Sequence, residues 1–222
     1  MTCRLSAVGL LIVAGGACSS LELPEVSNTV RVAPQCDDTT ESRYFPAEMF
    51  RWFPKSQSAG EWTREPSQIL YAMREPSLSC GLEPQSYRIL WVHSFSSWPP
   101  TVSKWPPTMV RISQSNDTWM VTAVQLAGSV NRKEVLRHER KISDTESQEM
   151  LAAVHEFGLW NRKDFAWNSD VNDGALWVVE GRRGTGYHPV FLGNADEEAV
   201  RKLAIVFLKI GDIKPSVLRG GE

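Results

Sequence analysis

The chain has 222 residues, and its 24 lysines and arginines against 26 aspartates and glutamates give a formal net charge of −2. This near balance, with no cluster of basic residues, argues against a nucleic-acid partner, because nucleic-acid-binding domains usually carry a basic excess. The length suits one hydrophobic core, and most of the 9 tryptophans are expected in it because each buries a large apolar surface.

Residues 1–17 predict a signal peptide for export. A short basic start precedes an apolar run, Leu5–Ala14, which is shorter than the roughly 20 residues that a membrane-spanning helix needs. Small residues follow the run and end at Cys18, which predicts cleavage before this cysteine and attachment of lipid, palmitate included, to it. Ordinary signal cleavage after Ala17 is the alternative.

The residues after Cys18 predict where such a lipoprotein resides. Ser19 and Ser20 follow the cysteine, and no Asp stands at the next position. By the sorting rule of bacterial lipoproteins in general, the protein is expected on the periplasmic side of the outer membrane. Its first partner is then the membrane itself, through the lipid anchor.

The remaining cysteines fit an oxidising compartment. Cys3 leaves with the signal peptide and Cys18 is assigned to the lipid, which leaves Cys36 and Cys80 as one pair. We expect a structural disulfide between them. Closing a loop of that size contributes roughly 4 kcal/mol to stability in the chain-entropy description.

The rest of the chain divides by composition. Residues 18–45 lack a sustained hydrophobic period and predict a flexible tether. Residues 46–215 predict a single domain, in which 46–85 form an N-terminal appendage with a short helix over Ser67–Arg74. Residues 216–222 are a tail.

The domain is predicted to be α+β. An almost continuously apolar segment predicts a central strand, and three further segments extend it as an antiparallel sheet, the last of them an edge or half-exposed strand. A capping box, Ser143 with Glu146, begins a helix that ends at Gly158. A hairpin and a last helix follow, so the order is β-β-β-β-α-β-β-α with the helices on one face of the sheet. The expected strands are 86–95, 108–113, 118–126, 134–142, 175–181 and 187–192.

Several of these segments together resemble a family of bacterial exported proteins and lipoproteins that has no assigned activity. The resemblance rests on a YRxLW strand, a helix ending in an aromatic motif, a DGAxWxLEG strand and a following YH pair, and it covers roughly residues 70–210. It implies export and an α+β fold, but no function. The chain departs from the family pattern after His188, where Pro189–Gly193 replaces an expected Arg-Trp-Ser-Pro element. The segments that carry the resemblance are Glu75–Leu78, Ser86–Phe95, Phe157–Trp160, Asp173–Gly181 and Gly186–His188.

Two constellations are candidate sites. Trp98 and Trp105 each precede two prolines in the loop after the central strand, and such rigidly held indoles suit binding of a partner or a sugar ring. Glu180 and His188 lie on neighbouring strands and form a possible base and orienting group, although no GxSxG nucleophile motif accompanies them. The four histidines show no metal-ligand spacing, so we expect no metal and no cofactor.

These observations favour an exported lipoprotein that binds an envelope protein or a cell-wall glycan and is not an enzyme. An exported hydrolase that uses the hairpin of Glu180 and His188 is the alternative. An inhibitor or immunity-type protein of the envelope fits the same sequence features.

Overall fold

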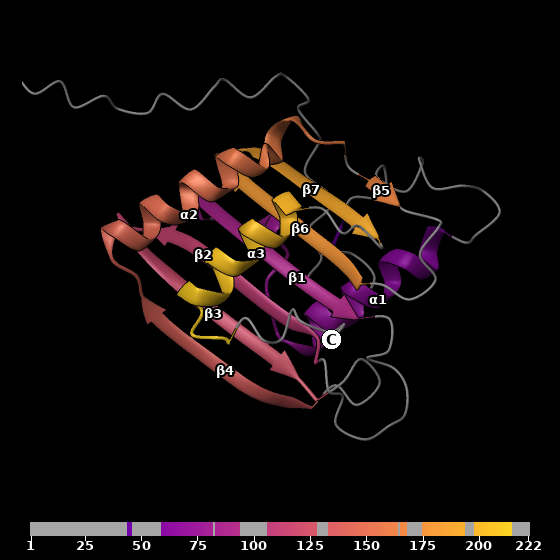
Figure 1. Cartoon of the computed structure of the whole chain (residues 1–222). Helices are drawn as coiled ribbons and strands as arrows, with labels where there is room; N and C mark the ends of the chain where they lie inside the picture. Colours follow the sequence, from indigo (N-terminus) through magenta and orange to yellow (C-terminus); the bar gives the residue numbers. More distant parts are fainter. Residues whose placement is uncertain are drawn as a thin grey trace, which may run out of the picture.

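One sheet, with seven strands in the part of the chain that the structure describes, organises this part of the molecule (Figure 1). The computed structural model describes residues 44–45, 59–81, 83–93, 106–127, 133–163, 165–167, 175–193 and 198–214. The strands lie in the order β4-β3-β2-β1-β6-β7-β5 across the sheet. They are β1 (Gln85–His93), β2 (Thr108–Ser115), β3 (Thr118–Leu126), β4 (Glu134–Lys141), β5 (Phe165–Trp167), β6 (Ala175–Arg183) and β7 (Gly186–Gly193).

Helices cover both faces of this sheet. In Figure 1, α2 and α3 lie side by side across the front face, and α1 lies behind it. Two short 3-10 turns, η2 and η4, follow α1 and α2 in the chain. The bounds are α1 (Ala59–Ala72), η2 (Leu78–Cys80), α2 (Asp144–Phe157), η4 (Leu159–Asn161) and α3 (Glu198–Ile210).

The α+β class is confirmed, and the two helices predicted within the domain, α2 and α3, lie on the same face of the sheet. The other face is covered by α1, which belongs to the predicted N-terminal appendage, and β1 is buried on both of its sides. The prediction of an antiparallel sheet is wrong in one detail, since β5 pairs with β7 in parallel. Three residues of β5 are too few to show a strand period, so the sequence placed them in a loop.

The core between the sheet and helices α2 and α3 follows from the two-residue period of a strand and the 3.6-residue period of a helix. Alternate residues of β1, namely Tyr87, Ile89 and Trp91, face the helices, as expected for a strand with a period of two. An apolar stripe of α3 meets them, with Val200, Leu203, Ala204 and Phe207 all buried. The ends of α2 match the sequence as well: Ser143 and Glu146 form the reciprocal capping box, and Gly158 is left-handed with φ 70°.

The opposite face of the sheet is apolar at one end and polar at the other. Leu90 and Val92 of β1 pack there against Ile69, Leu70 and Met73 at the end of α1. Helix α1 begins before the predicted start at Ser67 and includes Pro66. The polar end of this face carries the arginines that are described below.

The edge strand β4 is exposed along most of its length, as predicted. Its sequence is rich in charged side chains, which discourages unspecific pairing of the free strand edge with another chain. Within the described residues, no helix is both long and apolar enough to cross a membrane.

Candidate functional site

A crevice opens where α2 ends above the sheet. It has a volume of about 160 Å³ and lies between the last turns of α2, the turn η4, the start of β1 and the end of β6. Its walls combine apolar side chains with aromatic rings and a single guanidinium group. The lining residues are Tyr87, Leu151, Val154, His155, Gly158, Leu159, Trp160, Asn161 and Arg183.

Two glycines shape this crevice. Gly158 adopts φ 70°, which ends α2 and turns the chain back toward the sheet as η4. Leu159 and Trp160 then pack onto β6 at Gly181, where an added Cβ would lie 2.6 Å from Leu159 Cδ2. The close approach of η4 to β6 therefore depends on the missing side chain at this position.

Arg183 and Tyr87 set the electrostatics of the crevice. The guanidinium carbon of Arg183 lies 5.7 Å from the centre of the Trp160 ring, which is a cation–π distance. Burial raises the pKa of Tyr87, and the positive charge of Arg183 opposes that rise. Among the described residues that line the crevice, none is an aspartate or a glutamate.

The polar network lies on the other face of the sheet and centres on Arg88. Its Nε donates to Glu180 Oε2 at 2.6 Å and its Nη2 to Glu180 Oε1 at 2.9 Å, while both side chains have no exposed surface. Tyr187 donates a further hydrogen bond to Glu180 Oε1 at 2.8 Å. In register, Glu180, Arg88, Arg111 and Thr122 form one row across four neighbouring strands.

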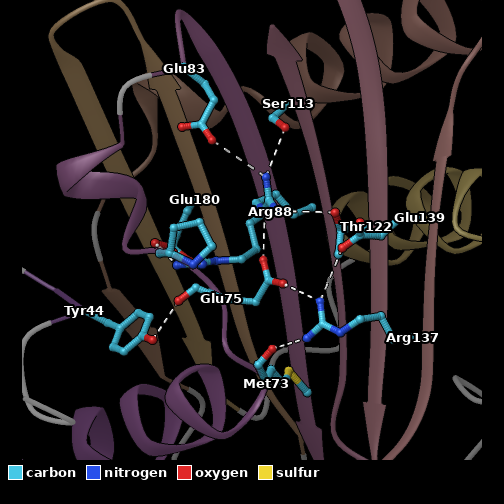
Figure 2. Close-up of polar contacts among 12 residues, drawn as sticks. Tyr44, Met73, Glu75, Glu83, Arg88, Ser113, Thr122, Arg137, Glu139 and Glu180 are labelled. Atoms are coloured by element: carbon cyan, nitrogen blue, oxygen red, sulfur yellow. Dashed lines mark hydrogen bonds and ion pairs between the residues drawn. The ribbon is translucent and has the colours of Figure 1, made fainter. Parts of the chain in front are cut away.

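This row holds the segment that connects α1 to η2. Arg111 Nε donates to the buried carboxylate of Glu75 at 2.7 Å, and Arg137 contacts both Glu75 and the carbonyl of Met73. Arg88 also donates to the carbonyl of Pro76 at 2.8 Å. Figure 2 shows Glu75 among these arginines, above the strands. These hydrogen bonds and ion pairs therefore hold the segment between α1 and η2 against the sheet, which is a structural role.

The structure does not bring the predicted pair Glu180 and His188 together. Glu180 is paired with Pro189 and His188 with Gly181, so the two side chains point to opposite faces of the hairpin. Glu180 is held by Arg88 and Tyr187, whereas His188 Nε2 lies 3.1 Å from the carbonyl oxygen of Arg162. The prediction that they meet as base and orienting group is wrong, because neighbouring positions along a strand alternate between faces.

Of the other predicted site residues, the structure describes only Cys80. Trp98, Trp105, Cys18 and Cys36 lie outside the described residues. Cys80 ends η2 and is a disulfide cysteine, but its partner is not among the described residues, so the pairing with Cys36 stays a prediction.

The crevice was not predicted from the sequence, although the position of Trp160 in the chain was informative. The sequence predicts Phe157–Trp160 only as the end of a helix. Trp160 follows the helix-ending glycine and belongs to no helical stripe, and this position was the available clue. Its proximity to Tyr87 and Arg183 depends on tertiary packing across three elements.

Comparisons with known proteins give no relative: no protein-family model matches the chain, and a search of curated proteins finds none that is similar.

Proposed function

We propose that this chain is an exported bacterial lipoprotein whose α+β domain binds a partner in the cell envelope. Cleavage before Cys18 and lipidation of that residue would hold the domain at the periplasmic side of the outer membrane, with residues 18–45 as the tether. The observation that carries the binding role is the crevice beside α2, where an apolar floor lies next to Trp160 and Arg183. Aromatic and arginine side chains are the groups that most often anchor a partner in protein interfaces.

The hydrolase alternative has less support. Its two proposed groups point to opposite faces of the sheet, and Glu180 has both oxygens engaged by Arg88. A general base must reach the proton that it takes, and this carboxylate is fully buried within an ion pair. The pair Trp98 and Trp105 stays a predicted second binding element.

The anchor is tested by metabolic labelling with a palmitate analogue. We expect label on the natural chain, and none on Cys18→Ala, together with loss of the variant from the membrane fraction. A natural chain without label would contradict the anchor and favour signal cleavage after Ala17.

The binding role is tested in cells with a photoreactive amino acid at exposed positions. His155 and Asn161 line the crevice and are exposed, whereas Ile205 is exposed on α3 and does not line it. We expect crosslinked adducts from the first two positions and none from Ile205. Absence of adducts at His155 and Asn161, or equal adducts at all three positions, would contradict binding at the crevice.

A further inference from the structure

We propose that a cleft at the end of α1 binds an acidic sugar, with the carboxylate of the sugar on Arg74 and its ring against Tyr71. Helix α1 lies on the face of the sheet opposite to α2, so this site is separate from the crevice and goes beyond the proposed function. The inference follows from the shape of the cleft, the backbone of Arg74 and the groups at the rim.

The cleft is large enough for a whole sugar unit. Its volume is about 600 Å³, within the roughly 300–1,000 Å³ that small-molecule sites occupy. One wall is the buried ring of Tyr44, which is held in place because its hydroxyl donates to the carbonyl of Glu75 at 2.7 Å. The lining residues are Tyr44, Tyr71, Ala72, Arg74, Glu75 and Pro76, of which Tyr71, Arg74 and Pro76 are exposed.

The backbone of Arg74 is left-handed, with φ 54°. The N–H of Arg74 donates to the carbonyl of Tyr71 at 2.9 Å and that of Glu75 to Leu70 at 3.1 Å, the pattern that ends a helix at a left-handed residue. Glycine suits this position best, because a Cβ is strained there. Within the described part of the chain, every other residue with a positive φ is a glycine, an asparagine or an aspartate.

The side chain of Arg74 has no structural contact that would offset this strain. Helix α3 ends at Asp212 in the same left-handed conformation, and Asp212 binds Arg140 at 3.3 Å. Among the residues that the structure describes, by contrast, none forms an ion pair or hydrogen bond with the guanidinium of Arg74. Strained residues of this kind concentrate where a protein holds a ligand.

Arg74 supplies the charge that selects an acid. An exposed guanidinium presents a fork of N–H donors that matches the two oxygens of a carboxylate. Glu75 is the one acidic residue among the described residues of the cleft, and its buried carboxylate binds Arg111 at 2.7 Å and Arg137 at 3.3 Å. Figure 2 shows this carboxylate among the arginines, with Tyr44 at the carbonyl of the same residue. Glu75 therefore does not compete with a ligand for Arg74.

The other groups of the cleft suit a hydroxylated ring. Tyr71 is 45% exposed and offers a flat aromatic face together with a hydroxyl that can donate or accept. The carbonyl of Ala72 lacks its helical donor, because the residue four positions on is Pro76, which has no N–H. This carbonyl can accept from a ligand hydroxyl. A ring that carries hydroxyls and one carboxylate uses all of these groups, whereas an acidic peptide side chain has no ring face for Tyr71.

The test measures binding of small ligands to the purified full chain by titration calorimetry. The probes are methyl glucuronide, the neutral amide of the same sugar, and acetyl-glutamate amide, which carries a carboxylate without a ring. We expect methyl glucuronide to bind at least about tenfold more tightly than its amide, which is what one charge-assisted contact supplies. Acetyl-glutamate amide should bind more weakly than methyl glucuronide.

Variants assign these differences to the two residues. Arg74→Gly should weaken methyl glucuronide about tenfold and affect the amide much less, while its stability toward denaturant should be at least that of the natural chain, because glycine adopts the left-handed conformation without strain. Tyr71→Ala should weaken both sugars, and Tyr71→Phe should retain most of the affinity. Lys163→Gln removes an exposed positive charge that does not line the cleft and should change neither affinity.

Four results would overturn the inference. They are equal binding of the glucuronide and its amide, unchanged affinity in Arg74→Gly, a loss of stability in Arg74→Gly, and binding of acetyl-glutamate amide as tightly as the sugar. None of these results bears on the crevice, which the crosslinks from His155 and Asn161 test independently. Failure of this site and failure of the proposed function are therefore distinguishable.

Discussion

Arg88 and Glu180 form a two-point ion pair across β1 and β6, and neither side chain has any exposed surface. Burial alone would lower the pKa of Arg88, but the carboxylate of Glu180 offsets this effect and the pKa is raised. Arg88 therefore stays charged inside the protein. Such a pair is stable only while both partners are present, because one buried charge alone is strongly unfavourable.

We expect Glu180→Gln to destabilise the fold by about 3–5 kcal/mol, because it leaves the Arg88 charge without its partner. Chemical denaturation of the natural chain and the variant measures the difference. The double variant Arg88→Met with Glu180→Leu should be less destabilised than Glu180→Gln, since it removes the buried charge altogether. A double variant that is as unstable as the sum of its single variants would contradict this account. Glu149→Gln, in an exposed pair with Lys209, is the control and should cost less than about 1 kcal/mol.

The stability of the folded chain is expected to depend on pH through Glu146. Hydrogen bonds from Arg140, and a further one from the backbone of Ser143, lower the pKa of Glu146 from 4.5 to about 2. A carboxylate with a depressed pKa in the folded state contributes stability that is present above its ordinary pKa and is lost as the pH falls through the folded value. The contribution of Glu146 should therefore disappear between about pH 4.5 and pH 2.

This dependence is measured by thermal unfolding between pH 2 and pH 6. At pH 6 we expect Glu146→Gln to unfold at a lower temperature than the natural chain, and the gap should shrink as the solution is made more acidic. A gap that stays constant over this range would show that the charge of Glu146 does not stabilise the start of α2.

Gly181 is predicted to accept a side chain only at a cost in stability. In Gly181→Ala the new Cβ would lie 2.6 Å from Leu159 Cδ2 and 3.2 Å from the Trp160 ring, so these packed side chains of η4 must shift. Overpacking of this kind costs about 1–3 kcal/mol, and here it should also open the crevice. Gly186→Ala is the control, because its nearest atom is the carbonyl oxygen of Arg183 at 3.4 Å. Equal stability of the two variants would contradict the close approach of η4 to β6.

Cys36 and Cys80 remain a predicted disulfide pair. We expect the exported chain without reductant to show no reactive thiol at Cys80, and Cys36→Ser to expose one. Each single serine variant should lose up to roughly 4 kcal/mol of stability, because the unfolded chain then regains loop entropy. Peptide mapping under non-reducing conditions identifies the pair, and a Cys80 linked to another cysteine would contradict it.

Secondary structure was largely readable from the sequence because its signals are local. The capping box of Ser143 and Glu146 and the left-handed Gly158 fixed α2 at both ends. The almost continuous apolar run of 86–95 predicted a central strand, and β1 is the middle strand of the sheet. Strand β5 was missed, because three residues carry too little pattern and their pairing with β7 is decided elsewhere in the chain.

The site was not readable in the same way, because it joins residues that are distant in sequence. Glu180 and His188 looked like a pair, yet the register of β6 and β7 puts them on opposite faces. Arginines of β1, β2 and β4 reach the segment between α1 and η2, and Arg182 of β6 reaches η2 itself. Only the order β4-β3-β2-β1-β6 makes these arginines neighbours.

The sequence by itself determined the expectation of export and most of the helices and strands, since these depend on residues within a few positions of one another. The tertiary structure alone decided which face of the sheet each helix covers, which carboxylate each arginine meets, and that Tyr87, Trp160 and Arg183 share one crevice. The physical reason is that strand order and register are set by packing of the whole chain, and a shift of one residue along a strand moves every side chain to the other face.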